Sequence, residues 1–254
     1  MTDTRGRCAS AMLASIGALA FTIACVTHEA IGHSTACLVS GHQILLLTSV
    51  YFRCANATWM TDLAGPLANG LAALLCGWML RRQYRWTPPT RLLIVFSMAF
   101  NGCWLAGCAI HAALLERGDL AFVLSGMAPP GSIVPRVVMA AAGLLAYLGV
   151  VRFTMTRLSS ETPVVAACLG ALAVAGIASA CFAGAVGPSL REGMLEGVGA
   201  TIGLLIASRR IASRSTTPGG FEMACSLRWM IASVLLALAF VLVLGHGLGD
   251  PARV

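Results

Sequence analysis

Long apolar runs separated by short polar stretches make up nearly the whole chain. Each run is about as long as the roughly 20 helical residues that cross the hydrocarbon core of a bilayer. The polar stretches carry the proline and glycine clusters typical of loops, at residues 87–90, 129–131 and 217–220. The pattern predicts seven transmembrane helices, over residues 9–33, 59–80, 92–115, 136–157, 163–186, 190–208 and 228–246.

One apolar stretch, from Gly41 to Phe52, is too short to cross a bilayer and is rich in residues that favour strands. It predicts a short hairpin or a re-entrant strand that lies against the helices. The expected fold class is therefore an all-α membrane protein, a polytopic helical bundle with a short membrane-associated β element after the first helix.

Composition excludes a soluble domain. The hydrophobic fraction is 58%, the charged fraction is 11% and the mean hydropathy is +0.84. A soluble domain carries charge on roughly a quarter of its residues, so this chain cannot cover a water-facing surface. The lipid bilayer is the expected surroundings, and a single bundle in the membrane is the expected unit.

The net charge of +7 comes entirely from arginine, since the chain contains no lysine. Arginines between apolar spans record topology, so the charge gives no indication of a nucleic-acid partner. With a cytoplasmic amino terminus, 12 of the 17 arginines fall in the inner loops, at positions 5, 7, 81, 82, 85, 91, 152, 157, 209, 210, 214 and 228. We expect an integral protein of a bacterial inner membrane, with its amino terminus inside and its carboxyl terminus outside.

The first span also has features of a secretory signal, with a basic start and small residues near Ala24-Cys25. An apolar stretch that leads directly into further spans favours a retained anchor over a cleaved signal. Most cysteines lie inside apolar runs, where a thiol behaves as a small hydrophobe. Cys54 lies outside them, and a disulfide to another outer cysteine is open to it.

The densest group of ionisable residues is Thr27-His28-Glu29-Ala30-Ile31-Gly32-His33, at the end of the first span. Ionisable residues at membrane depth are costly and are functional by default. Two imidazoles flanking a carboxylate suit a divalent metal, because neutral nitrogens bind the ion and a carboxylate can take a proton from water. The alternative is the polar end of a helix that leaves the bilayer.

This cluster resembles the zinc motif of the site-2 protease-like intramembrane metalloproteases, in which two histidines bracket a catalytic glutamate. The likeness continues in a β element, matched by Gly41–Phe52, and in a span that begins with a signature similar to Ala64-Gly65-Pro66-Leu67-Ala68-Asn69. A later span of that family ends near an aspartate beside glycine, which resembles Gly118-Asp119. The resemblance covers roughly residues 15–122 and implies a zinc site of His28, His33 and Asp119.

The chain departs from the family in the spacing of its histidines, which are five residues apart and not four. Five residues of a regular α-helix turn the second side chain about 140° away from the first, so both cannot reach one ion. A one-residue π-bulge at Gly32 would restore the geometry, and such bulges concentrate at functional sites. Alternatively, Glu29 and His33, four apart, are co-ligands.

Two further acids or histidines compete with Asp119 for the third ligand. His111 lies inside the third span, where a hydrogen-bonded packing role is the alternative, and Asp62 precedes the Gly65-Pro66 turn, where Asp favours a helix amino terminus. The family resemblance implies that Asn69 positions substrate, whereas membrane packing favours a contact with a neighbouring helix.

Glu192 and Glu196 lie on one face at the start of the sixth span, beside Arg191. Acidic side chains at the start of a helix interact favourably with the helix dipole, and an acid next to an arginine can form an ion pair, so this arrangement is typical of helix stabilisation.

These observations predict a zinc-dependent intramembrane metallohydrolase, a peptidase that acts on transmembrane or membrane-proximal protein substrates. Glu29 is the expected general base, and zinc is the expected cofactor. Residues 1–125 form the metalloprotease-like core, with three spans and the β element, and residues 126–254 add further helices to the same membrane domain. The alternative is a non-catalytic membrane protein, a degenerate protease or small transporter, that uses the same cluster to bind an ion or a partner.

Overall fold

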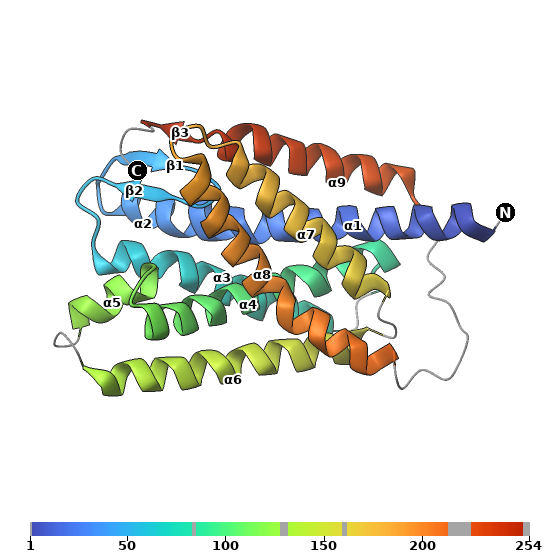
Figure 1. Ribbon diagram of the computed structural model, residues 1–254, viewed down its shortest axis with the longest axis horizontal. Helices are drawn as coiled ribbons and strands as arrows, with labels where there is room; N and C mark the ends of the chain where they lie inside the picture. Colours follow the sequence, from blue (N-terminus) through green and yellow to red (C-terminus); the bar gives the residue numbers. More distant parts are fainter. Residues whose placement is uncertain (1, 83–84, 128–131, 159–161, 213–224, 251–254) are drawn as a thin grey trace.

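Long helices run side by side along one axis, and a small sheet covers one end of them in the computed structural model (Figure 1). The structure describes residues 2–82, 85–127, 132–158, 162–212 and 225–250. The first elements are α1 (Thr2–Val26), the π-helix η1 (Thr27–His33), α2 (Ser34–Val39), β1 (Ile44–Leu47) and β2 (Phe52–Cys54). They are followed by α3 (Trp59–Arg81), α4 (Pro88–Leu115), α5 (Asp119–Met127), α6 (Ile133–Arg157), α7 (Thr162–Ala180), α8 (Val186–Ala212), α9 (Leu227–Phe240), the π-helix η2 (Val241–Gly245) and β3 (Leu248–Gly249).

Five helical stretches are long and apolar enough to cross a membrane: Gly6–Val39, Trp59–Arg81, Pro88–Leu115, Ile133–Arg157 and Leu227–Gly245. They support membrane insertion. The other two predicted spans correspond to α7 and α8 but do not meet the same standard in the described part of the chain. The apolar stretch of α7 is shorter, Val164–Ala180, and α8 carries Arg191, Glu192 and Glu196 near its start. A count of seven spans therefore stays a prediction.

The helix ends follow from local sequence. Thr58 begins α3 through a reciprocal capping box with Thr61, and two prolines open α4, where a missing N–H costs nothing. Glu116 (φ 54°) and Gly118 (φ 82°) adopt left-handed backbone conformations that end α4 and turn the chain sharply into α5. The predicted loops at 129–131 and 217–220 lie outside the described residues.

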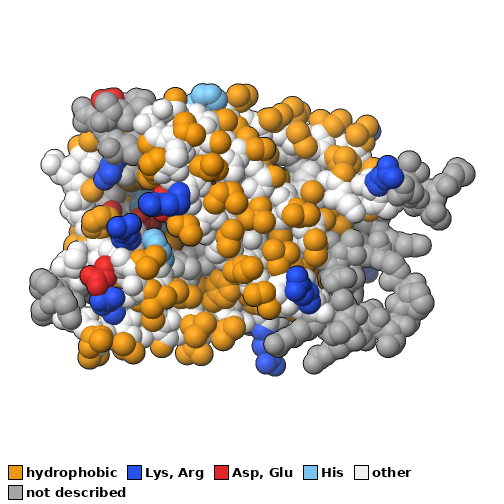
Figure 2. Space-filling model, in the orientation of Figure 1, with side chains coloured by type: hydrophobic (Ala, Val, Ile, Leu, Met, Phe, Trp, Pro, Cys, Tyr) orange, Lys and Arg blue, Asp and Glu red, His pale blue; other side chains and the backbone are white. Residues whose placement is uncertain are grey.

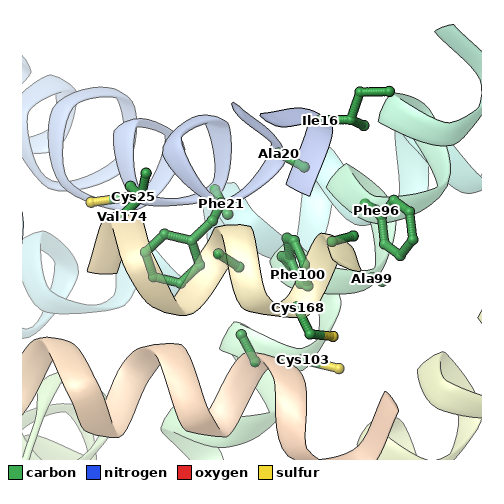
Figure 3. Close-up of a cluster of buried hydrophobic side chains, with 14 of the residues drawn as sticks. Ile16, Ala20, Phe21, Cys25, Phe96, Ala99, Phe100, Cys103, Cys168 and Val174 are labelled. Carbon is green, nitrogen blue, oxygen red and sulfur yellow. The ribbon is translucent and has the colours of Figure 1, made fainter. Parts of the chain in front are cut away.

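The core lies where α1 meets α4 and α7. Phe21, Phe96 and Phe100 fill it, together with small residues such as Ala20 and Ala99, which Figure 3 shows between the three helices. Gly17 of α1 faces the backbone of α7, and Gly170 of α7 faces the backbone of α1. Small residues at such crossings let helices approach closely in a membrane, where packing replaces the hydrophobic effect.

The predicted β element is confirmed as a short antiparallel hairpin of β1 and β2, with Leu47 opposite Phe52. β3, from near the carboxyl terminus, pairs with the other edge of β1 and gives the strand order β2-β1-β3. A disulfide between Cys37 and Cys54 ties α2 to the hairpin. A second disulfide, Cys8–Cys225, joins α1 to the start of α9 at the opposite end of the bundle (Figure 1).

Hydrophobic side chains cover the long flank of the molecule, and charged side chains gather toward its two ends (Figure 2). The outer faces of α3 and α6 expose leucines such as Leu67, Leu71, Leu74, Leu144 and Leu145. Exposed apolar surface of this extent fits contact with lipid. The β hairpin and the histidine cluster described below lie at the same end of the bundle, which carries fewer arginines than the other.

Candidate metal centre

The histidine motif is a π-helix, which resolves the five-residue spacing. All seven residues from Thr27 to His33 adopt this conformation, a wider distortion than the single bulge predicted at Gly32. The backbone N–H of Ser34 bonds to the carbonyl of Glu29, five residues earlier, as the π-helix requires. A π-helical turn stacks residues five apart, so the His28 and His33 rings lie with their centroids 4.8 Å from each other.

Two glycines hold this segment against α3. A β-carbon at Gly32 would lie 2.6 Å from the Cα of Gly65, so the two backbones touch. A β-carbon at Gly65 would collide with the His33 ring. The Gly65-Pro66 signature therefore has a steric explanation, because only glycine leaves the space that the His33 ring occupies.

Asp119 reaches both histidines from the first residue of α5. Its Oδ2 lies 2.9 Å from Nε2 of His28 and 3.4 Å from Nε2 of His33. The left-handed turn at Gly118 directs the chain toward the cluster. Burial by itself raises the pKa of the Asp119 carboxyl, but the hydrogen bonds and positive charge of the two histidines outweigh it and lower the pKa.

The three side chains fit a divalent metal. Their ligand atoms lie within 4.8 Å of one another, and both histidines are 3% exposed. Zinc–nitrogen and zinc–oxygen bonds of about 2.05 Å give a tetrahedral edge of about 3.3 Å, and the two histidine–aspartate distances lie on either side of that value. A tetrahedral ion held by these three side chains would have a fourth position open to another ligand.

Neighbouring groups fix the orientation of each ring. Nδ1 of His33 lies 2.7 Å from the carbonyl oxygen of Thr61. A carbonyl only accepts hydrogen bonds, so Nδ1 carries the hydrogen and Nε2 is the atom that can bind an ion. Trp104 stacks on His28 with 5.4 Å between centroids, and Phe52 of β2 stacks on His33 at 5.3 Å.

Glu29 is buried beside the cluster and is 4% exposed. Its Oε2 atom has no hydrogen-bond partner among the described residues. An unpaired buried carboxylate oxygen costs free energy unless something outside the protein binds it. This atom is therefore available to a water molecule or a substrate.

Comparisons of the chain with protein-family models, with curated proteins and with solved structures give no match. The resemblance to the site-2 protease-like family thus rests on the sequence motifs alone.

The remaining predicted residues lie in different surroundings. Asn69 is fully buried on α3, and neither atom of its amide has a partner within the described ranges. His111 lies close to Gly118, and Asp62 is half-buried in the first turn of α3. Of the three candidates for a third ligand, the structure brings Asp119 into the group with His28 and His33.

Sequence reasoning missed the supporting residues of the site. Trp104, Phe52 and the carbonyl of Thr61 contact the histidines only because three separate segments meet there. The Cys37–Cys54 pair had a partial signal, since Cys54 was one of the cysteines outside the apolar runs. Cys37 follows His33 by one helical turn, and a search for cysteines near the motif would have found it.

Proposed function

We propose that the chain is a zinc-dependent intramembrane metallohydrolase, a peptidase that cleaves transmembrane or membrane-proximal segments of other proteins. One observation carries the proposal. A π-helix aligns two histidines that an α-helix would separate, and it does so beside an aspartate and an unpaired buried glutamate. π-helical segments are rare and concentrate at functional sites.

Each residue has a chemical role in this proposal. His28, His33 and Asp119 hold the ion, which when bound acts as a Lewis acid and makes water a stronger nucleophile. Glu29 takes the proton of the attacking water and can return it to the leaving amine. The amide of Asn69, neither atom of which has a partner among the described residues, can bind the backbone of the substrate.

The sheet suggests how a substrate lies at the site. β1 has strand partners on both sides, whereas β2 pairs with β1 alone among the described strands. A free strand edge is a template for an extended peptide. Because Phe52 of β2 stacks on His33, a peptide added to β2 would lie next to the ion site. A helical substrate must therefore unwind into an extended segment before cleavage.

The test combines metal content with hydrolysis. Purified protein should contain about one zinc per chain and cleave a panel of unwound transmembrane peptides in detergent or vesicles. A chelator should remove both, and added zinc should restore both. The Glu29→Gln protein should keep its zinc and lose cleavage. Zinc-loaded protein with no cleavage of any peptide in the panel would contradict the peptidase assignment.

A second candidate function has one observation in its favour. Asp119 already pairs with both histidines, so the cluster satisfies part of its own polar groups with no ion. A non-catalytic protein that uses the cluster to bind an ion or a partner would keep such pairs. Protein that binds an ion through the cluster and loses it in the His28→Ala variant, yet cleaves no peptide in the panel, would favour this candidate.

A further inference from the structure

The edge strand β2 carries a positive charge at its middle residue, Arg53, which is exposed. Two other arginines at the hairpin end of the bundle, Arg136 and Arg191, pair with acids. The Arg53 side chain has no hydrogen-bond or ion-pair partner within the described ranges. Asp62 of α3 lies within electrostatic range of Arg53 but forms no ion pair with it. The guanidinium of Arg53 is therefore open to an acid from outside the chain.

The backbone of β2 offers hydrogen-bonding groups on its outer side. On the β1 side, the carbonyl of Tyr51 accepts a hydrogen bond from Thr48, and the N–H of Ala55 donates to a carbonyl just before β1, both at 2.9 Å. Backbone groups point alternately to the two sides of a strand, so those of Phe52 and Cys54 face the edge that has no strand partner in the described part of the sheet. An extended peptide can add to β2 there as a further strand.

The side chains of β2 alternate between the two faces of the sheet. Phe52 stacks on His33, so it points toward the metal cluster. Cys54 is bonded to Cys37 of α2 and points to the same face. Arg53 lies between them and points to the opposite face. Directly opposite residues of paired strands have their side chains on one face, so the peptide residue opposite Arg53 lies against the guanidinium, and its neighbour faces the metal cluster.

We propose that Arg53 selects peptide substrates with an aspartate or glutamate next to the residue that faces the metal cluster. This inference rests on the proposed function and on the addition of substrate to β2. Opposite charges across a strand pair attract each other, and like charges repel. A charge on an edge strand also disfavours pairing with apolar or cationic segments. The acid of the substrate therefore determines which segment binds and in which register.

Binding of short peptides tests the proposal. The probes are fluorescent peptides rich in threonine and valine that differ only in a central Asp, Asn or Lys. They are added at low salt to purified Glu29→Gln protein in detergent, so that a bound peptide stays uncleaved. The Asp peptide should bind at least about threefold more tightly than the Lys peptide, which is within the usual range for cross-strand charge pairs. High salt should reduce the difference, because the pair is exposed.

Variants of Arg53 in the same protein show whether this arginine causes the preference. Arg53→Glu should reverse the order of the Asp and Lys peptides, and Arg53→Gln should remove the difference between them. The matched control is Arg82→Glu, the same change at an exposed arginine that ends α3 at the far end of the bundle. It gives the same net charge and should keep the natural order.

Equal affinities for the Asp and Lys peptides, an unchanged order in Arg53→Glu, or no binding of any probe would overturn the proposal. Cleavage by the natural protein gives a second measurement. Moving the acid along a peptide should move the cleaved bond by the same number of residues, and a fixed bond would contradict the register. Failure of the peptidase assignment gives a different result, namely peptides that bind with this charge preference and are never cleaved.

Discussion

The two π-helical segments, η1 and η2, share a backbone conformation and differ in what they carry. η1 continues α1 and η2 continues α9, and both contact the β hairpin: His33 of η1 stacks on Phe52, and Leu244 of η2 accepts a hydrogen bond from the backbone N–H of Ser49. η1 buries His28, Glu29 and His33, whereas η2 consists of Val241-Leu242-Val243-Leu244-Gly245. The histidine that follows η2, His246, is exposed and lies outside the metal-ligand group.

The difference shows that the π-helix is a means of alignment and not itself a site. A π-helix brings side chains five residues apart onto one face. This alignment can form a metal site only where both side chains carry an atom that can bind the ion. In η1 the pair so aligned is His28 and His33. In η2 the corresponding pair is Val241 and His246, and the only donor group of that pair faces outward.

The largest expected effect is the loss of metal from η1 variants. His28→Ala and His33→Ala should each lower zinc affinity by more than about 100-fold, which is the upper range for changes that only support a ligand. His246→Ala, next to η2, should keep the zinc of the natural protein. Metal analysis after dialysis gives the result, and equal zinc in all three variants would contradict the site.

Glu29→Gln separates a general base from a ligand. The amide keeps the shape of the side chain but cannot accept a proton, so the hydrolysis rate should fall by about 10²–10⁴-fold with zinc retained. Glu192→Gln, a change of the same kind outside the cluster, should hydrolyse at the natural rate. Loss of zinc in the Glu29→Gln protein would instead make Glu29 a co-ligand of His33.

The segment next to η1 is joined to the hairpin by the disulfide Cys37–Cys54. η2 contacts the same hairpin through a backbone hydrogen bond, which the N–H of Ser49 donates to the carbonyl of Leu244. Cys37 and Cys54 are 17 residues apart. Closing a loop of this size stabilises a protein by about 3 kcal/mol. Cys37→Ser should therefore lower the unfolding midpoint in denaturant, and Cys181→Ser, a change at a free cysteine, serves as the control. An unchanged midpoint would show that the bond does not form.

The smallest expected effect compares the glycines of the two segments. A β-carbon at Gly32 would meet the backbone of α3 at 2.6 Å, whereas one at Gly245 would meet its nearest atom at 3.0 Å. Gly32→Ala should destabilise the protein by about 1–3 kcal/mol, the usual range for overpacking. Gly245→Ala should cost less. Thermal unfolding measures both, and a larger cost at Gly245 would contradict the packing of η1 on α3.

Local sequence was sufficient for a membrane helical bundle with a β element after its first helix, and it offered a π-bulge as one of two alternatives for the histidine spacing. Apolar runs predict where helices lie because only a continuous apolar surface is stable in the hydrocarbon core of a bilayer. The five-residue spacing of His28 and His33 predicts a π distortion, since an α-helix cannot align the pair. The π-helix extends over all of Thr27–His33, further than the single bulge predicted, and Gly32 within it packs on the backbone of Gly65, a contact between separate segments that local sequence does not reveal.

The choice among Asp119, His111 and Asp62 could not be made from sequence alone. The position of Asp119 depends on the left-handed turn at Glu116 and Gly118, which sets the direction of α5 relative to η1. Contacts of this kind join residues 91 positions apart and leave no periodic signal along the chain. For the same reason, the aromatic rings that stack on the histidines were not anticipated.

The two cysteine pairs lie at opposite ends of the bundle, so their redox states can show which end faces which side of the membrane. Cells maintain disulfides on one side of a plasma membrane and thiols on the other. A bilayer across the bundle therefore exposes one pair to an oxidising compartment and the other to a reducing one. If the amino terminus is cytoplasmic, Cys37–Cys54 lies on the oxidising side and Cys8–Cys225 on the reducing side. Alkylation of intact cells before lysis would then show on which side of the membrane the histidine cluster lies.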